Sequence, residues 1–459
     1  MLDRADRTFL LRQAAASGFT GLAAQAIWAR AAALVLGGGA QTQALVLGAY
    51  LSGLALGAAT LGRRAEAAAR PLEAAGKLQL AVAALIALSA PASWALGLLP
   101  ESIRVLAAFL LVFAPAIIQG AVLPALSAHA HRSERLFQWL YAANAVGAAL
   151  GAVSASFLFV PSLGLDGALI GIAFVCAAAG LDAFRRGALP TRREAERAPL
   201  LEPGTGAAAV FAAALAAMTA ELVWMRITAL SGGSSEHTFA GAAAAVILGG
   251  ALGALAAGPL SRRLGRDALT VALASQAVAL PLCLLACARL PYVFALLRTT
   301  VPDGIPGFYL FETFKLAAIC LILLPATAAA GAAVPLAFTA EGERRASLVL
   351  AAGGAGSLAG AAAALLLLPY AGLDGAVRAA AAVCAVAAAA CALRIGRHRA
   401  AGFALACLAV PLLCPALERS GLATGAFRVR GMPLSSYQAF TEAVFGGHDF
   451  SKSPYNRAL

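Results

Sequence analysis

The sequence predicts an all-α polytopic membrane protein with two parallel six-helix repeats and one extra C-terminal span, about thirteen transmembrane helices in all. Of its 459 residues, 61% are hydrophobic and only 12% are charged, a composition that no soluble protein of this size needs for its core. The apolar runs reach the roughly 20 residues that cross a bilayer core. A backbone in lipid must satisfy its own hydrogen bonds, so each run is expected to be a helix.

Six spans are expected in the first repeat, residues 1–184. They cover 13–36, 41–61, 77–99, 105–126, 137–160 and 165–183. A cytoplasmic linker rich in Arg and Pro, 185–206, leads to the second repeat, 207–397. The spans of this repeat cover 207–230, 239–260, 268–288, 311–338, 348–368 and 375–393. A shorter apolar run at 398–416 is expected to be the extra span, which leaves 417–459 as a tail.

A recurring motif predicts that the two sets of spans are copies of one unit. AQAIWAR at 24–30 returns as AELVWMR at 220–226, 196 residues later. Farther along, FAPAIIQGAVLP, VGAALG and PSLGLDG are matched by LLPATAAAGAAVP, AGSLAG and PYAGLDG at offsets of 208 to 211 residues. Because six crossings are an even number, both repeats enter the bilayer from the same side, as in the halves of major facilitator transporters.

Basic residues fall in alternate loops and predict the orientation. The N-terminus, GRRAEAAARPLEAAGK, HAHRSER, the linker, SRRLGR, GERRAS and RIGRHR share one side, whereas the opposite loops before the tail hold only Arg104, Arg289 and Arg298. Since Lys and Arg are retained in short cytoplasmic loops, the N-terminus is expected in the cytoplasm and the tail in the periplasm. The formal charge of +12 is then a topology signal. The lipid bilayer is the expected partner, and no nucleic acid is expected.

Small residues are expected to hold the helices close together. Gly-x-x-x-Gly pairs occur at matched places in both repeats, at 53/57, 147/151, 249/253 and 356/360, and such pairs let helix backbones approach each other in membranes. The eight cysteines all lie in expected spans, where Cys behaves as a small apolar residue. We expect no cofactor and no metal site.

Polar side chains inside the spans are candidates for a substrate- or ion-binding site, because such groups usually face a bundle interior or a cavity. They are Gln25, Gln119, Asn144, Glu221, Glu312 and Lys315. Glu312 and Lys315, three residues apart, are expected to pair near the outer interface. Glu221 lies near the bilayer midplane, about 13 Å from the outer end of its span at roughly 1.5 Å per residue. It is either a charge-bearing site for a cation or proton, with Gln25 as its neutral counterpart, or a structural carboxyl bonded to another helix.

Trp28 with Arg30, and Trp224 with Arg226, stand near the outer ends of the first span of each repeat. One interpretation is that the arginines reach lipid phosphate and the tryptophans anchor the membrane interface; the other is a functional role. His237, in the outer loop of the second repeat, is either a pH-sensitive group or a solvated loop histidine.

The residues also resemble a known family. SGFTGLAAQAIWARAAALVLGGG, LGAYLSGLALGA, APAIIQGAVLPAL and LYAANAVGAALGAVSASFLFVPSLGLDGALIGIAF are similar to the membrane part of the bacterial fused major-facilitator/spermidine-synthase proteins, from about residue 17 to 416. The resemblance implies a bacterial inner-membrane protein. The acid usual in the first copy of the motif is Gln25 here. The tail resembles the connector to an aminopropyltransferase-like domain, and we expect no such domain in this sequence.

Three functions are compatible with these observations. The parallel repeats favour a secondary transporter for a small cationic or polar metabolite, polyamine-like by resemblance only. The tail favours the alternative, a noncatalytic membrane module that docks a separately encoded synthase-like or other periplasmic partner through residues 417–459. A membrane-embedded enzyme would need a cluster of His, Asp and Glu or a nucleophile beside its base. We find neither pattern in the spans and do not expect catalysis.

Overall fold

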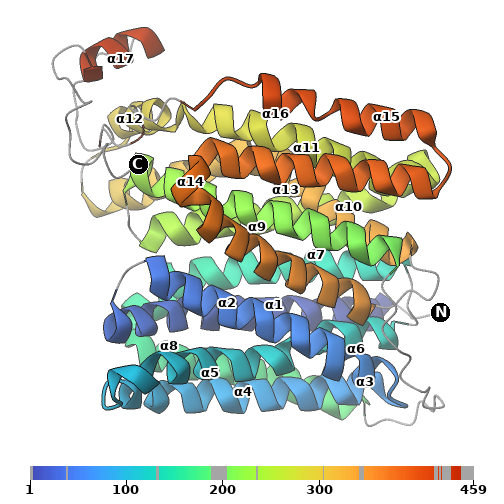
Figure 1. The fold of residues 1–459 in the computed structure, drawn as a ribbon. Coiled ribbons are helices and arrows are strands. Elements are labelled where there is room, and N and C mark those ends of the chain that lie inside the picture. Colours follow the sequence, from blue (N-terminus) through green and yellow to red (C-terminus); the bar gives the residue numbers. More distant parts are fainter. Residues whose placement is uncertain are drawn as a thin grey trace.

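The computed structural model describes residues 4–37, 40–130, 134–187, 204–233, 236–302, 304–340, 346–417, 422, 425 and 436–445. All regular structure in these ranges is helical (Figure 1). Nine apolar stretches in them are long enough to cross a membrane, and three of these, Arg135–Gly187, Ala240–Cys287 and Ala346–Arg394, have 48 to 53 residues. Each of the three folds as two crossings, which gives twelve in the described residues. The prediction of an all-α polytopic membrane protein is confirmed.

The first repeat consists of six crossings joined by short helices. Its elements are α1 (Arg4–Leu36), α2 (Ala40–Gly57), the π-helix η1 (Ala58–Gly62), α3 (Arg63–Glu66), α4 (Pro71–Leu96), α5 (Glu101–Gly120), α6 (Val122–His129), α7 (Glu134–Ser154), the π-helix η2 (Ala155–Phe159) and α8 (Val160–Gly187). Most of the expected linker, at 188–203, lies outside the described residues.

The second repeat has the same order of crossings. Its elements are α9 (Thr205–Gly232), α10 (Glu236–Leu264), η3 (Gly265–Asp267), α11 (Ala268–Cys287), α12 (Leu290–Thr300), α13 (Ile305–Ala340) and α14 (Ala346–Arg394). The helix α12 was not predicted, because its 11 residues are too few for a span. It lengthens the second repeat between its third and fourth crossings.

Glycines bring equivalent helices of the two repeats into backbone contact. A Cβ atom on Gly57 of α2 would overlap the carbonyl oxygen of Ile117 on α5, and a Cβ atom on Gly253 of α10 would overlap that of Ala328 on α13. The same kind of contact joins α7 to α1 and α14 to α9, through Gly147, Gly151, Gly356 and Gly360. These contacts recur at the offsets of the sequence motifs, so equivalent helices of the two repeats pack in the same way.

A glycine turn separates the fifth and sixth crossings of each repeat. Gly164 in α8 and Gly372 in α14 have φ angles of 69° and 66°, in the left-handed region that glycine enters without a steric penalty. Both glycines end matched sequences, PSLG and PYAG. A side chain at either position would strain the turn that sends the chain back across the bundle.

One end of the bundle carries most of the basic side chains and is called the basic end below. Arg186 at the end of α8 lies 4.1 Å from the ring centroid of Phe9, near the start of α1. Arg394 at the end of α14 donates to Thr205 Oγ1, at the start of α9, at 3.1 Å. Both repeats therefore enter from the same end, at the right in Figure 1. That this end faces the cytoplasm stays a prediction.

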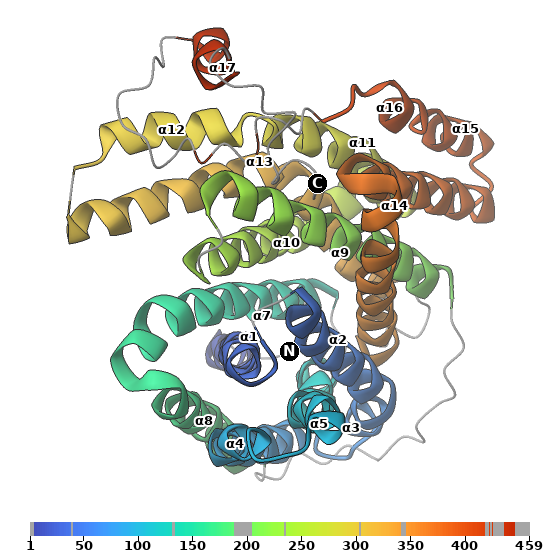
Figure 2. The ribbon, with the colours of Figure 1, turned by 60° about the vertical axis from the view of Figure 1, so that its left-hand side comes forward.

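The two repeats meet mainly through their second and fifth crossings. The helix α7 packs against α10, and α14 packs against α2. In Figure 2, the first repeat (blue to teal) and the second (green to orange) form two adjacent bundles. Each contact pairs the fifth crossing of one repeat with the second crossing of the other, which is the exchange that a two-fold axis between the repeats requires.

The segment 398–416 differs from the single extra span that was expected. It forms two short helices, α15 (His398–Ala406) and α16 (Ala409–Leu413), and at roughly 1.5 Å per residue neither is long enough to cross a bilayer alone. After α16, the Leu417 amide donates to Asp374 Oδ1 at 2.8 Å, just past the glycine turn of α14. The chain thus runs from the basic end to the opposite end along α11 and α14. A thirteenth crossing of the lipid stays a prediction.

Part of the C-terminal tail packs on the unpredicted helix α12. The tail helix α17 (Tyr437–Phe445) places the Tyr437 ring edge-on to Tyr292, with ring centroids 5.7 Å apart. The guanidinium carbon of Arg289 lies 3.6 Å from the Tyr437 ring centroid, and Phe440 is buried against Tyr292. This tail helix is therefore held at the end opposite the basic end. The last segment, SPYNRAL, lies outside the described residues.

Candidate functional site: the cavity between the repeats

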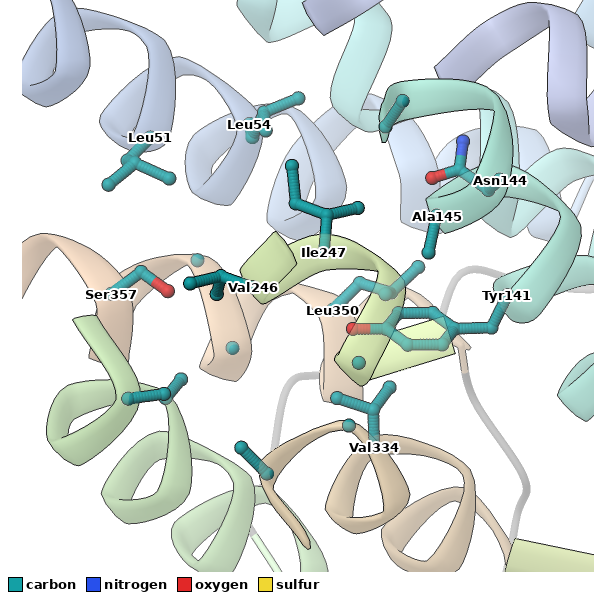
Figure 3. A pocket seen from close by; sticks show the side chains of 18 of the residues that line it. Leu51, Leu54, Tyr141, Asn144, Ala145, Val246, Ile247, Val334, Leu350 and Ser357 are labelled. Carbon is teal, nitrogen blue, oxygen red and sulfur yellow. The ribbon is translucent and has the colours of Figure 1, made fainter. Parts of the chain in front are cut away.

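A cavity of about 400 Å³ lies where the two repeats meet, and we call it the central cavity. Its walls come mainly from α1, α2, α5 and α7 of the first repeat and from α9, α10, α13 and α14 of the second. Figure 3 shows Tyr141 and Asn144 from α7 on one side, with Val246 and Ile247 from α10 and Ser357 from α14 around the same space. The matched second and fifth crossings thus line the cavity as well as joining the repeats.

Three of the predicted site residues, Gln119, Asn144 and Glu221, line the central cavity. Most of the remaining wall is Gly, Ala, Val and Leu, so helix backbones come close to the cavity. Among the described lining residues, Glu221 alone is charged, and there is no Lys, Arg or His. The structure thus brings together half of the polar side chains that the sequence analysis named.

The first repeat supplies an amide and hydroxyl cluster. Gln119 Nε2 donates to the backbone oxygen of Ser17 at 2.7 Å and to Ser17 Oγ at 2.8 Å. Asn144 Nδ2 donates to the carbonyl oxygen of Ala14 at 3.2 Å. Gly21 on α1 leaves the room that the Tyr50 hydroxyl and the Gln119 amide occupy, since a Cβ atom there would lie 2.6 Å from the hydroxyl oxygen. The amide groups are therefore held in fixed orientations against α1.

The second repeat supplies the charge. Among the described residues, the Glu221 carboxylate makes no hydrogen bond and no ion pair. One turn along α9, Trp224 is 1% exposed, and its Nε1 has no partner in the same described ranges. An unmatched carboxylate at membrane depth costs free energy unless it is protonated or a cation is close. The cavity therefore holds a charge and a buried donor that the described protein atoms leave unsatisfied.

Gln25 and Trp28 do not take up the positions in the cavity that Glu221 and Trp224 have. The part of α1 that lines the cavity ends at Leu22. Trp28 Nε1 instead donates to Ser89 Oγ on α4 at 2.8 Å, which keeps its indole within the first repeat. The interpretation of the two tryptophans as interfacial anchors is wrong, because both are buried. Of the two arginines, Arg226 is exposed and Arg30 is half-buried.

Glu312 and Lys315 lie in a second cavity of about 230 Å³, which we call the end cavity. As predicted, they form an ion pair, with Lys315 Nζ 2.8 Å from Glu312 Oε1. Lys315 Nζ also donates to Thr238 Oγ1 at 3.1 Å and to the carbonyl oxygen of Gly232 at 3.3 Å. The lysine thus has three partners, so its charge is neutralised and its donors are used.

The end cavity follows the central cavity along the same three helices, α7, α10 and α13. Its wall includes His237, whose ring stacks on Phe157 of η2 with centroids 4.2 Å apart and an interplanar angle of 23°. This stack joins the two repeats toward the end opposite the basic end. His237 is therefore a packed group and not a solvated loop histidine. Sequence reasoning missed Phe157, because nothing local distinguishes it from other apolar residues.

At the basic end, two contacts hold the repeats together. Phe137 on α7 and Phe338 on α13 are fully buried and stack with ring centroids 4.1 Å apart. Glu66 of α3 is buried and accepts hydrogen bonds from the Ser347 amide, at 3.1 Å, and from Ser347 Oγ. Since Ser347 is in the first turn of α14, the carboxylate also faces the positive end of a helix dipole. On α7, α13 and α14, these contacts lie beyond the residues that line the central cavity, on the side of the basic end.

No family model matches the sequence, and no curated protein is detectably similar to it. The fold is similar to the crystal structure of the nucleoside transporter NupG, with 14% identity and a TM-score of 0.49 over 88% of this chain and 98% of that chain. It is also similar to the POT family transporter PepTSo, with 14% identity and a TM-score of 0.41 over 90% of this chain and 98% of that chain. The helices and contacts themselves define a polytopic membrane protein with two parallel repeats around a cavity.

Proposed function

We propose that this chain is a secondary transporter of the major facilitator type for a small cationic solute, placed in a bacterial inner membrane with its basic end in the cytoplasm. The observation that carries the proposal is the Glu221 carboxylate, which lines the central cavity without a partner among the described residues. A bound cation or a proton would match this charge. A carboxylate that holds either of them, and exchanges one for the other, couples solute movement to proton movement.

The contacts between the repeats suit alternating access, in which two repeats rock about a site near the bilayer midplane. The Phe137–Phe338 stack and the Glu66–Ser347 hydrogen bonds close the basic end. The end cavity continues the central cavity toward the other end, where the His237–Phe157 stack crosses between repeats. Breaking one set of contacts while keeping the other would open the central cavity to one side at a time.

The proposal predicts that Glu221 is needed for cation-dependent charge movement. We expect full-length protein in liposomes on a solid-supported membrane to give transient currents when a panel of organic amines is added. Glu221→Gln keeps the size and hydrogen bonding of the side chain and removes the charge, so the currents should fall at least tenfold. Glu101→Gln, an exposed acid at the start of α5, is the matched control and should behave as wild type. Unchanged currents in folded Glu221→Gln would refute the proposal.

A docking module for a periplasmic or synthase-like partner is the second candidate, and the placement of α17 bears on it. In the described part of the tail, Tyr437 and Phe440 pack on Tyr292 within the same chain. The aromatic side chains that an interface would use as anchors are thus already engaged. This favours a tail that braces the second repeat, and transport remains the function that we propose.

A further inference from the structure

We infer that the substrate class is an organic monocation with an apolar body, an inference that rests on the proposed function and names what the same site accepts. The observation is the charge count of the central cavity. Glu221 is the one charged residue among its described lining residues, and none of them is basic. A ligand with one positive charge neutralises this wall completely. A neutral ligand contributes no charge, and the carboxylate must then be matched by a proton.

The same count argues against a polyamine, the substrate that the family resemblance implies. A polyamine carries several positive charges, and each needs an opposite charge or several polar partners when it leaves water. Glu221 matches one of them. The rest would face mostly Ala, Val and Leu side chains, and a neutral acceptor such as Gln119 Oε1 supplies no opposite charge. In these surroundings, the desolvation free energy of a second, unmatched positive charge exceeds the free energy that its contacts with the wall contribute.

The shape and polarity of the wall select the rest of the ligand. Tyr50, Tyr141 and Trp224 line the cavity with Glu221, and aromatic faces stabilise an organic cation as well as apolar groups. A volume of about 400 Å³ fits a body with one or two rings. Trp224 Nε1 and Gln119 Oε1 are buried without partners in the described ranges. A hydrogen-bond acceptor and a donor on the ligand would satisfy them.

Three probes separate charge from shape: tryptamine, which carries one positive charge at neutral pH, tryptophol, its neutral hydroxyl counterpart, and spermidine, which carries several charges. Calorimetric titration of the full-length protein in lipid nanodiscs, with empty nanodiscs subtracted, gives the three dissociation constants. Tryptamine should bind at least tenfold more tightly than tryptophol and spermidine. In Glu221→Gln, tryptamine should lose its advantage over tryptophol, whereas Glu101→Gln should keep it.

Each outcome decides the inference. If spermidine binds as tightly as tryptamine and both depend on Glu221, the monocation inference falls and the proposed cation transporter stands. If tryptamine and tryptophol bind equally tightly to wild type, Glu221 does not discriminate between a charged and a neutral ligand, and the inference also falls. The proposed function fails by a different result, the unchanged currents of Glu221→Gln in liposomes. A circular dichroism spectrum and a melting temperature close to wild type show that the variant is folded.

Discussion

Glu312 and Lys315 illustrate how a single ion pair is used at membrane depth. The side chains are 7% and 3% exposed, so each charge depends on the other and on the hydrogen bonds from Lys315 to Gly232 and Thr238. Removing one partner of such a pair leaves a buried charge without compensation. The pair Glu73–Lys77 on α4 has a similar distance, 2.7 Å, but the Lys77 side chain is 64% exposed. It offers a matched comparison.

Lys315→Met should lower the free energy of unfolding by about 3–5 kcal/mol, because the Glu312 carboxylate loses its buried partner. Lys77→Met, which breaks an exposed pair, should change it by about 1 kcal/mol or less. Thermal melting in detergent should therefore show a clear drop for the first variant and almost none for the second. The double variant Glu312→Gln with Lys315→Met should recover much of the loss. Equal melting temperatures for Lys315→Met and wild type would show that the pair is not needed for stability.

At the scale of helices, packing is set by glycines that are placed one or two turns apart. On α2, Gly53 and Gly57 face α5, and a Cβ atom on either would collide with its backbone or side chains. Gly48, on the same helix, has open space around the position of a Cβ atom. The second repeat has the same arrangement on α10, where Gly253 is in contact with α13 and Gly250 is open. On each helix, one glycine therefore permits a close helix contact, whereas the other has room for a side chain.

Gly57→Ala should destabilise the protein by about 1–3 kcal/mol, because α2 and α5 must separate to admit the methyl group. Gly48→Ala should have no cost and should gain up to about 1 kcal/mol from helix propensity. Melting temperatures of the two purified variants test this contrast. Gly253→Ala against Gly250→Ala repeats the experiment in the second half. If both members of a pair melted alike, the close contact would not control stability.

At the scale of the whole molecule, the closed basic end depends on a contact between the repeats. Glu66 ends the loop helix α3 of the first repeat, and its carboxylate accepts the Ser347 amide and hydroxyl of the second. A charge-assisted hydrogen bond contributes about 1.5–3 kcal/mol. If this contact forms only when the basic end is closed, its loss shifts the balance toward an open basic end by roughly the same amount.

Glu66→Gln should make the central cavity more accessible from the basic end. A cysteine introduced at Ser357, which lines the cavity, reports this as a rate of thiol labelling in inside-out vesicles. Adding Glu66→Gln to Ser357→Cys should raise the labelling rate roughly tenfold or more, in proportion to the lost free energy. The parent protein without the new cysteine gives the background from the native cysteines, most of which are buried. A rate that does not change would mean that Glu66 does not hold the basic end closed.

The fold was predictable from the sequence because two of its signals are local. Apolar runs give the crossings, and repeated motifs such as PSLGLDG and PYAGLDG give the duplication. The site was only partly predictable. Glu221, Gln119 and Asn144 are polar groups in apolar helices and stand out, whereas Tyr50 and Tyr141 read as ordinary aromatic residues. The pairing of Glu66 with Ser347, 281 residues apart, depends on how the repeats pack, which no local pattern contains. Gln25 was predicted as a site residue because it occupies the position in the first repeat that Glu221 has in the second. It does not line the cavity, so an equivalent sequence position does not guarantee an equivalent place in the structure.

Because both repeats are on one chain, the number of charges at the centre of the molecule can be odd. A symmetric dimer of a six-helix protein must present every side chain twice across its axis, so the net charge that it offers there is always even. Two covalently joined copies are free of this restriction, and here position 25 is Gln while its counterpart 221 is Glu. A single charge near a pseudo-symmetric centre makes the two repeats different for a ligand. A bound molecule therefore has a defined orientation relative to the two halves, with its positive group toward the repeat that carries the acid.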